Sequence, residues 1–173
     1  MIRSAFLAVF AALALTGAAI AQDAAPTDPQ IAHIAYTAGQ IDIAAADQAL
    51  EKSKNADVIA FAELMKRDHA AVNDQALALV KKLGVTPEDN ATSQKLAADA
   101  AAKLKELGAL EGAAFDVAYV ANEVAYHQAV NGALSTVLIP AAQNAELKAL
   151  LETGLKLFTE HQQHAEHLAT QVK

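Results

Sequence analysis

The sequence predicts an all-α protein, built as an antiparallel four-helix bundle with an extra short helix between the second and third long helices. The first observation is composition, because Ala, Leu, Lys, Glu and Gln dominate while the 173 residues include only 7 Gly and 4 Pro. The second is spacing, because apolar residues recur three and four positions apart over four long stretches. The connections are short apart from one, which favours antiparallel neighbours.

The N-terminal segment resembles a secretory signal peptide. It has a positive start at Arg3, an apolar run from Ala5 to Leu15 and a small-residue end at Ala21. The run is short for a membrane-spanning helix, and no second run of that kind follows. We therefore expect cleavage after Ala21 and a periplasmic or otherwise exported protein. The expected organisation is a signal peptide over 1–21, a linker over 22–28 and a bundle domain over 29–173.

Charge and cysteine content exclude several classes of function. The chain has no cysteine, so disulfides, a thiolate nucleophile and a thiolate metal site are all excluded. The formal charge of −7 becomes −8 when Arg3 leaves with the signal peptide. This acidity argues against binding to nucleic acid or anionic lipid, which both require basic surfaces. No transmembrane segment is expected in the mature chain, and a protein partner or a homo-oligomer stays open.

The first two long helices each carry one titratable residue within an apolar stripe. The first is expected over residues 29–54, where alanines surround Asp42. The second is expected over residues 56–83, between an N-cap at Asn55 and a stop at Gly84. His69 is in register with its apolar residues, which are Val58, Phe61, Met65, Val72, Ala76, Leu79 and Leu83.

A loop over residues 85–90 precedes the short helix. Thr92 or Ser93 is expected to cap this helix, which continues to about Glu106. The segment is rich in Ala and Lys and has few large apolar residues. We therefore expect a peripheral element.

The third and fourth long helices repeat the pattern of a polar residue within an apolar stripe. The third is expected over residues 112–137, ended by Pro140, and it carries Glu123 and His127 one turn apart on one face. The fourth is expected from an Asn144 cap nearly to the C-terminus, with His161 in register with its apolar face.

These titratable groups are expected at one level of the bundle. At about 1.5 Å of rise per residue, all of them fall within a turn or two of its midpoint. Helix bundles build metal and ligand sites in this way. Imidazole with carboxylate suits several transition metals, and export makes copper, zinc or iron the candidates. The candidate metal ligands are His69, His127 and His161, together with Asp42 and Glu123.

A second interpretation needs no metal. Asp42 with His69, and Glu123 with His127 or His161, would then be buried polar pairs that fix the register of the helices. The protein would be a non-catalytic envelope protein that acts on protein partners through its acidic surface. A third alternative is a redox enzyme that uses a bound metal against peroxide or superoxide.

Other histidines and motifs contribute less. His164 and His167 lie outside the best apolar stripe, near a helix C-terminus that favours positive charge, and His33 is assigned no role. Met65 is expected in the core, and Asp116 on a flank. The di-iron pattern of Glu-x-x-His on two helices is absent, so ferroxidase and oxygenase chemistry are not supported. No triad of Ser, His and Asp and no phosphate loop is found.

Short motifs on all four long helices resemble a known family. They are Asp42-Ile43, Phe61-Ala62-x-x-Met65-x-x-Asp68-His69, Phe115-Asp116-x-x-Tyr119, His127-Gln128 and Leu155-x-x-Phe158-x-x-His161. In these the chain resembles the bacterial domain-of-unknown-function 4142 family of exported, ferritin-like proteins. It departs from the family at Asp42, where Glu is typical, and at Lys156, where Pro is common. The resemblance implies a ferritin-like bundle in the periplasm or envelope and no established reaction.

Together these observations lead to one working hypothesis. The chain is expected to be an exported four-helix bundle that binds a transition metal or small ligand at mid-bundle, in metal handling or envelope stress protection. The ligands would be the three histidines, aided by Asp42 or Glu123.

Overall fold

The computed structural model describes residues 25–173, which are helical and contain no strand. The signal peptide expected over residues 1–21, its cleavage after Ala21 and the first residues of the linker lie outside the described residues. Among the described helices, none combines the length and the apolar character needed to cross a membrane. The elements are α1 (Asp28–Lys52), α2 (Ala56–Leu83), α3 (Ala91–Gly108), α4 (Gly112–Ala133), the π-helical segment η1 (Leu134–Leu138), α5 (Ile139–Ala141) and α6 (Ala145–Ala169).

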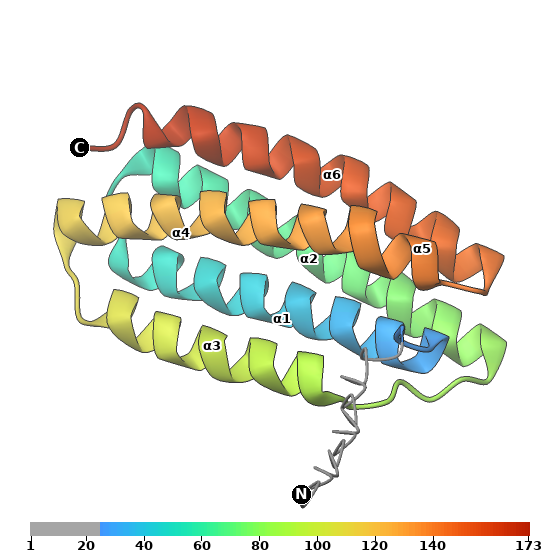
Figure 1. The fold of residues 1–173 in the computed structure, drawn as a ribbon. Coiled ribbons are helices and arrows are strands. Elements are labelled where there is room, and N and C mark those ends of the chain that lie inside the picture. The colour runs from blue at the N-terminus through green and yellow to red at the C-terminus, as the bar shows by residue number, and fades with distance from the viewer. Residues whose placement is uncertain (1–24) are drawn as a thin grey trace, which may run out of the picture.

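The long helices lie side by side along one direction (Figure 1). Helix α1 packs chiefly on α2, and α4 packs chiefly on α6. Helix α3 runs along the outer side of α1, with only Ser93 and Leu107 buried. The short helix is therefore peripheral, as predicted.

The helix starts depend on asparagine side chains. Asn55 and Asn144 accept hydrogen bonds from the first free backbone N–H groups of α2 and α6, as predicted. The expected cap of α3 at Thr92 or Ser93 is wrong by two or three residues, because Asn90 caps this helix. Ser93 instead accepts a hydrogen bond from the backbone N–H of Asn90 at 3.1 Å, which completes a capping box.

The third long helix ends differently from the prediction. Regular α-helix stops at Ala133, and the chain continues through η1 into α5, which includes Pro140. Proline has no backbone N–H and its ring crowds the preceding turn, so the i→i−4 ladder cannot pass through Pro140 unchanged. The wider π-turn of η1 accommodates it, and the chain leaves the helix only after Ala141.

Two apolar clusters fill the interior. One contains Phe61, Met65, Phe115 and Tyr119, which are all fully buried, so the expected core position of Met65 is confirmed. The other lies toward η1 and α6 and is built mainly from Ile and Leu side chains. A third set of buried residues is polar or charged, and its members are Asp42, Ser53, His69, Asn73, Ser93, Asp116, Glu123, His127 and His161.

Replacing the cap of α6 tests how much this helix start contributes. Asn144 Oδ1 accepts from the backbone N–H groups of Glu146 at 2.9 Å and Leu147 at 3.0 Å. Asn144→Ala leaves both donors without a partner and is expected to lower the free energy of unfolding by about 1 kcal/mol in urea denaturation. Asn144→Asp keeps an acceptor and is the control, expected within a few tenths of a kcal/mol of the wild type. Equal stability of all three proteins would contradict the assignment.

Candidate metal centre

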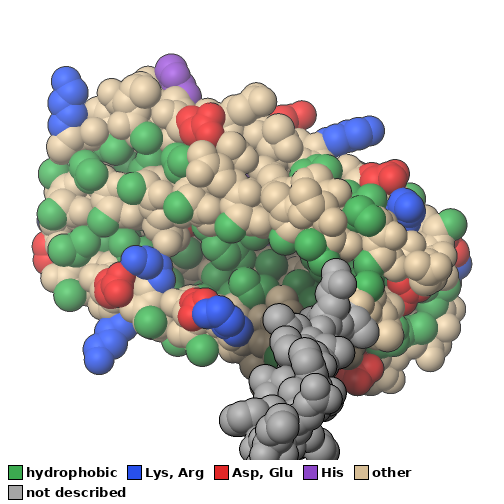
Figure 2. Space-filling view, in the orientation of Figure 1, with side chains coloured by type: hydrophobic (Ala, Val, Ile, Leu, Met, Phe, Trp, Pro, Cys, Tyr) green, Lys and Arg blue, Asp and Glu red, His purple; other side chains and the backbone are tan. Residues whose placement is uncertain are grey.

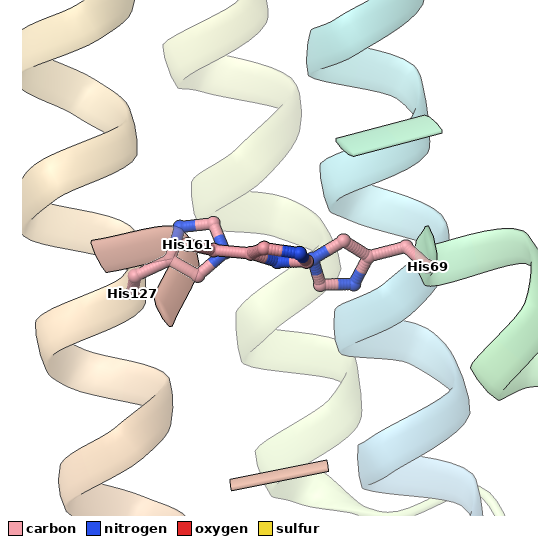
Figure 3. Close-up of side chains that lie close together, drawn as sticks. All are labelled: His69, His127 and His161. Carbon is pink, nitrogen blue, oxygen red and sulfur yellow. The ribbon is translucent and has the colours of Figure 1, made fainter. Parts of the chain in front are cut away.

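Three buried histidines from three helices converge at the middle of the molecule. His69 comes from α2, His127 from α4 and His161 from α6, and each is at most 2% exposed. Their ring centroids form a nearly equilateral triangle with sides of 5.4, 5.5 and 5.6 Å. One ring nitrogen of each lies within 4.8 Å of the other two (Figure 3). The structure thus brings together the three histidines that the sequence placed at one level.

Asp42, on α1, lies beside two of the three histidines. Its Oδ2 lies 3.5 Å from His69 Nε2 and 3.6 Å from His127 Nε2. Both distances are too long for good hydrogen bonds. They are close to the separation of about 3.4 Å between two ligand atoms that each bind a tetrahedral ion at about 2.0–2.1 Å. Asp42 therefore lies close to both imidazoles without forming a good hydrogen bond to either.

Glu123 lies beside His127 on the same helix. Its Oε2 is 3.7 Å from His127 Nδ1, and Asp42, Glu123 and His127 form a second group whose ligand atoms lie within 4.8 Å of one another. The expected proximity of Glu123 to His127 is therefore present. In the described residues, the ion-pair contact of His161 is with Asp68, and Glu123 faces His127 instead.

Hydrogen bonds outside the cluster fix the tautomers of two rings. His127 Nδ1 lies 3.0 Å from the carbonyl oxygen of Glu123, and a carbonyl can only accept, so Nδ1 carries the proton. His161 Nε2 lies 3.1 Å from the Asp68 carboxylate and donates to it in the same way. The lone pairs then reside on His127 Nε2 and His161 Nδ1. Metal-binding histidines are oriented by the same kind of outer hydrogen bond.

Two further residues hold the rings in place. Phe158 stacks on His69 with centroids 4.6 Å apart and an angle of 5° between the planes. Asp68 also accepts a hydrogen bond from Arg67 Nε at 2.8 Å. Although burial opposes ionisation, the hydrogen bonds from Arg67 and His161 hold the pKa of Asp68 below its usual value. An ionised Asp68 keeps its partner His161 in one orientation.

The cluster contains buried polar atoms that lack hydrogen-bond partners among the described residues. Such atoms are rare in native proteins because each loses its hydration without replacement. These atoms lie together within the histidine and carboxylate cluster. They are Asp42 Oδ1 and Oδ2, His69 Nδ1 and Nε2, Glu123 Oε2, His127 Nε2 and His161 Nδ1.

Burial keeps the imidazoles neutral. Loss of hydration, together with the neighbouring histidines, lowers the pKa of His69 to about 2. Burial likewise lowers the pKa of His127 to about 4 and lowers that of His161. Metal ions bind the neutral imidazole, so these rings are ready for ligation at neutral pH without first losing a proton.

The two carboxyl groups are shifted in the opposite direction. Burial raises the pKa of Asp42 to about 7. Burial and the nearby Asp42 charge raise the pKa of Glu123 well above its usual value. Without a cation, Asp42 therefore keeps its proton up to about pH 7 and Glu123 keeps its proton to a higher pH than usual, and an incoming cation would displace these protons.

A cavity of about 250 Å³ leads from the surface to these carboxyl groups. It lies between α1, α3 and α4, and both Asp42 and Glu123 line it. The exposed residues Asp99 and Lys103 of α3 line its outer part. The centre thus has an approach for a small ion from the side covered by α3.

The remaining histidines lie elsewhere, as the sequence indicated. His33 Nδ1 is 3.8 Å from Asp89 on the surface, His167 is exposed, and the exposed His164 packs against the ring of Phe61. Asp116, expected on a flank, is instead buried at 7% exposure, and it is not in the cluster.

Sequence reasoning missed the contacts that orient the rings. Asp68 appeared in the sequence only as the neighbour of His69 in a family motif, whereas in the structure it contacts His161 on α6. Phe158 likewise appeared only in a family motif, and its stacking on His69 was not anticipated. The motif Asp68-His69 carried a signal for the first of these contacts, because it stood out in the family resemblance.

Replacing Asp42 tests the raised pKa of its carboxyl group in metal-free protein. The folded protein holds a proton on Asp42 up to about pH 7, whereas the unfolded chain releases it near pH 4. Stability from this group is therefore lost as the pH rises from 4 to 7. Asp42→Asn is expected to gain stability relative to wild type over that range, by at most about 1.4 kcal/mol per pH unit. Urea denaturation in the presence of a chelator measures the difference.

The control for this experiment is Asp42→Glu, which keeps a carboxyl group at the position. It should retain a wild-type-like dependence of stability on pH. A stability difference between wild type and Asp42→Asn that does not change with pH would contradict the raised pKa.

Comparison with known proteins agrees with the resemblance noted in the sequence. No curated protein and no solved structure gives a significant match to this chain. A family model described as a domain of unknown function, DUF4142, matches residues 13–168, a span that includes all five residues of the cluster. The chain therefore belongs to the DUF4142 family.

Proposed function

We propose that the protein is an exported, ferritin-like, antiparallel four-helix bundle, with α3 as its extra helix, that binds one transition-metal ion at mid-bundle. His69, His127 and His161 would supply three imidazoles, and Asp42 would supply a carboxylate oxygen. Glu123 would stand beside the ion as a proton acceptor or an additional ligand. The role would be metal handling or protection against envelope stress.

One observation carries this proposal. Asp42 Oδ2 lies 3.5 and 3.6 Å from two imidazole nitrogens without a hydrogen bond to either. Neutral polar groups that merely fix helix register would be expected to close to about 3 Å, because leaving them unpaired and buried is costly. Spacing of this kind supports a site in which an ion, rather than a hydrogen bond, joins Asp42 to the imidazoles.

The donor set narrows the choice of metal. Three imidazoles with one carboxylate suit zinc, copper or iron and lack the oxygen-rich surroundings that calcium and magnesium require. The three histidine nitrogens lie within 4.8 Å of one another, and the Asp42 oxygen lies within 3.6 Å of two of these residues, so small side-chain rotations would bring them to bonding distance. An ion would also compensate the unpaired lone pairs of His69 and His127.

The alternative, a fold-fixing cluster without metal, is also favoured by one observation. A protonated Asp42 could donate to His69 or His127 after a small rotation, since its pKa is raised to about 7. The protein would then act through its acidic surface on protein partners. Two experiments separate the proposals.

The first experiment is elemental analysis of mature, untagged protein after purification and after loading with zinc, copper or iron. Wild type is expected to retain about one equivalent of metal. A triple variant, His69→Ala with His127→Ala and His161→Ala, is expected to retain none. The matched control replaces the other three histidines, His33, His164 and His167, with alanine and should retain the wild-type amount. Absence of metal from wild type after all three loadings would overturn the metal proposal.

The second experiment compares the stability of wild type and His127→Ala with and without metal. At a free-ion concentration 100 times the dissociation constant, wild type should gain about 2.7 kcal/mol. His127→Ala should be less stable than wild type in either condition, because a cavity replaces a buried ring. Under the metal proposal the variant also loses most of the metal-dependent gain. The same deficit in both conditions would support the fold-fixing alternative.

A further inference from the structure

A second cavity, of about 170 Å³, occupies the half of the molecule between the histidine cluster and η1. Helices α1, α2, α4 and α6 all contribute to its walls. The wall residues of α1 and α2 include small ones, such as Ala35, Ala38 and Ala76, where larger side chains would fill the interior. These small side chains leave part of the space between the helices unfilled.

The cavity is open to small molecules. Ala129 and Ala133 line it and are themselves exposed to solvent. Leu96 and Tyr126 line both this cavity and the one that reaches the carboxyl groups. Figure 2 shows a recess with hydrophobic side chains on its floor on this side, between the positions of α3 and α4 in Figure 1. The π-helical segment η1 contributes Leu134 and Leu138 to the wall. Such segments occur frequently at functional sites.

One polar side chain in this apolar wall has a buried nitrogen without a hydrogen-bond partner among residues 25–173. Asn73 is 4% exposed, and its Nδ2 is buried without an acceptor among the described residues. Tyr126, another polar side chain of the wall, already donates its hydroxyl to the carbonyl of Ala38 at 2.7 Å. The amide of Asn73 lies against Gly39, where a β-carbon would overlap it. The structure thus holds a free donor at a fixed place in an apolar cavity.

Size and chemistry define the ligand. An apolar cavity of about 150 Å³ is large enough to bind benzene. We propose that this cavity binds a small, mainly apolar organic molecule, of about the size of one substituted aromatic ring, that carries one hydrogen-bond acceptor for Asn73. A buried donor without a partner is costly, so a molecule with an acceptor gains over an isostere without one. This proposal does not depend on metal binding and stands if the centre holds no ion.

The test uses two molecules of nearly the same shape, acetophenone and α-methylstyrene. Acetophenone has a carbonyl oxygen, which accepts a hydrogen bond. At the same position α-methylstyrene has a methylene group, which does not. Titration of metal-free protein is followed by amide shifts in two-dimensional NMR. Both should bind, and acetophenone should bind about three- to tenfold more tightly, as expected for one net hydrogen bond. Absence of saturable shifts with both molecules would overturn the proposal.

Variants locate the binding. Ala76→Leu fills the cavity and is expected to abolish binding of both molecules, whereas Ala78→Leu, an exposed position on the same helix, is the matched control and should leave both unchanged. Asn73→Leu removes the donor at similar volume and should make the two affinities equal. Unchanged binding in Ala76→Leu would overturn the proposal. The comparison of two molecules in wild-type protein reports on the donor even if Asn73→Leu fails to fold.

Discussion

The structure depends on one electrostatic constraint. Five ionisable side chains are buried together, and none of them can carry a charge that lacks a compensating partner. They are Asp42, His69, Glu123, His127 and His161. Taking an isolated charge out of water is far more costly than the net stability of a domain allows. The imidazoles therefore remain neutral, and below about pH 7 the carboxyl groups of Asp42 and Glu123 hold protons unless a cation replaces those protons. The helices, their caps and the two apolar clusters hold these groups at one level. Consequently the charge state of the centre and the stability of the fold are linked.

The orientation of the rings is fixed from outside the cluster. Asp68 and His69 are adjacent in sequence, and successive residues on a helix point about 100° apart. His69 can therefore face the interior while Asp68 reaches His161 on the neighbouring helix. The carbonyl of Glu123 and the ring of Phe158 have the same function for His127 and His69. Each of the three rings thus has one specific contact that restricts its rotation.

Much of this architecture could be predicted from periodicity. The stripes on the long helices placed His69, His127 and His161 at one height, and the structure brings the three rings within 5.6 Å of one another. Contacts between helices were less predictable, because they depend on helix rotation and side-chain conformation. The contact of Asp68 with His161 is an example, and so is the capping of α3 by Asn90 instead of by a residue two or three positions later.

The cavities were not predictable for a related reason. A stripe of alanines predicts close approach of helices as readily as it predicts empty space. Which of these occurs depends on how far the facing helices approach. The π-turn of η1 was also not predictable, because a proline near a helix end usually indicates that the helix stops. Here the chain instead accommodates Pro140 within helical structure.

The position of Phe158 links the histidine cluster to the apolar cavity. Its ring stacks on His69 and also forms part of the wall of the apolar cavity. A molecule in that cavity would contact Phe158 directly, and an ion at the centre would act on Phe158 through His69. If a molecule in the cavity changes the affinity of the centre for an ion by some factor, the ion must change the affinity of the cavity for that molecule by the same factor, because binding free energies are reciprocal. The ring of Phe158 would then help to couple two chemically unlike ligands.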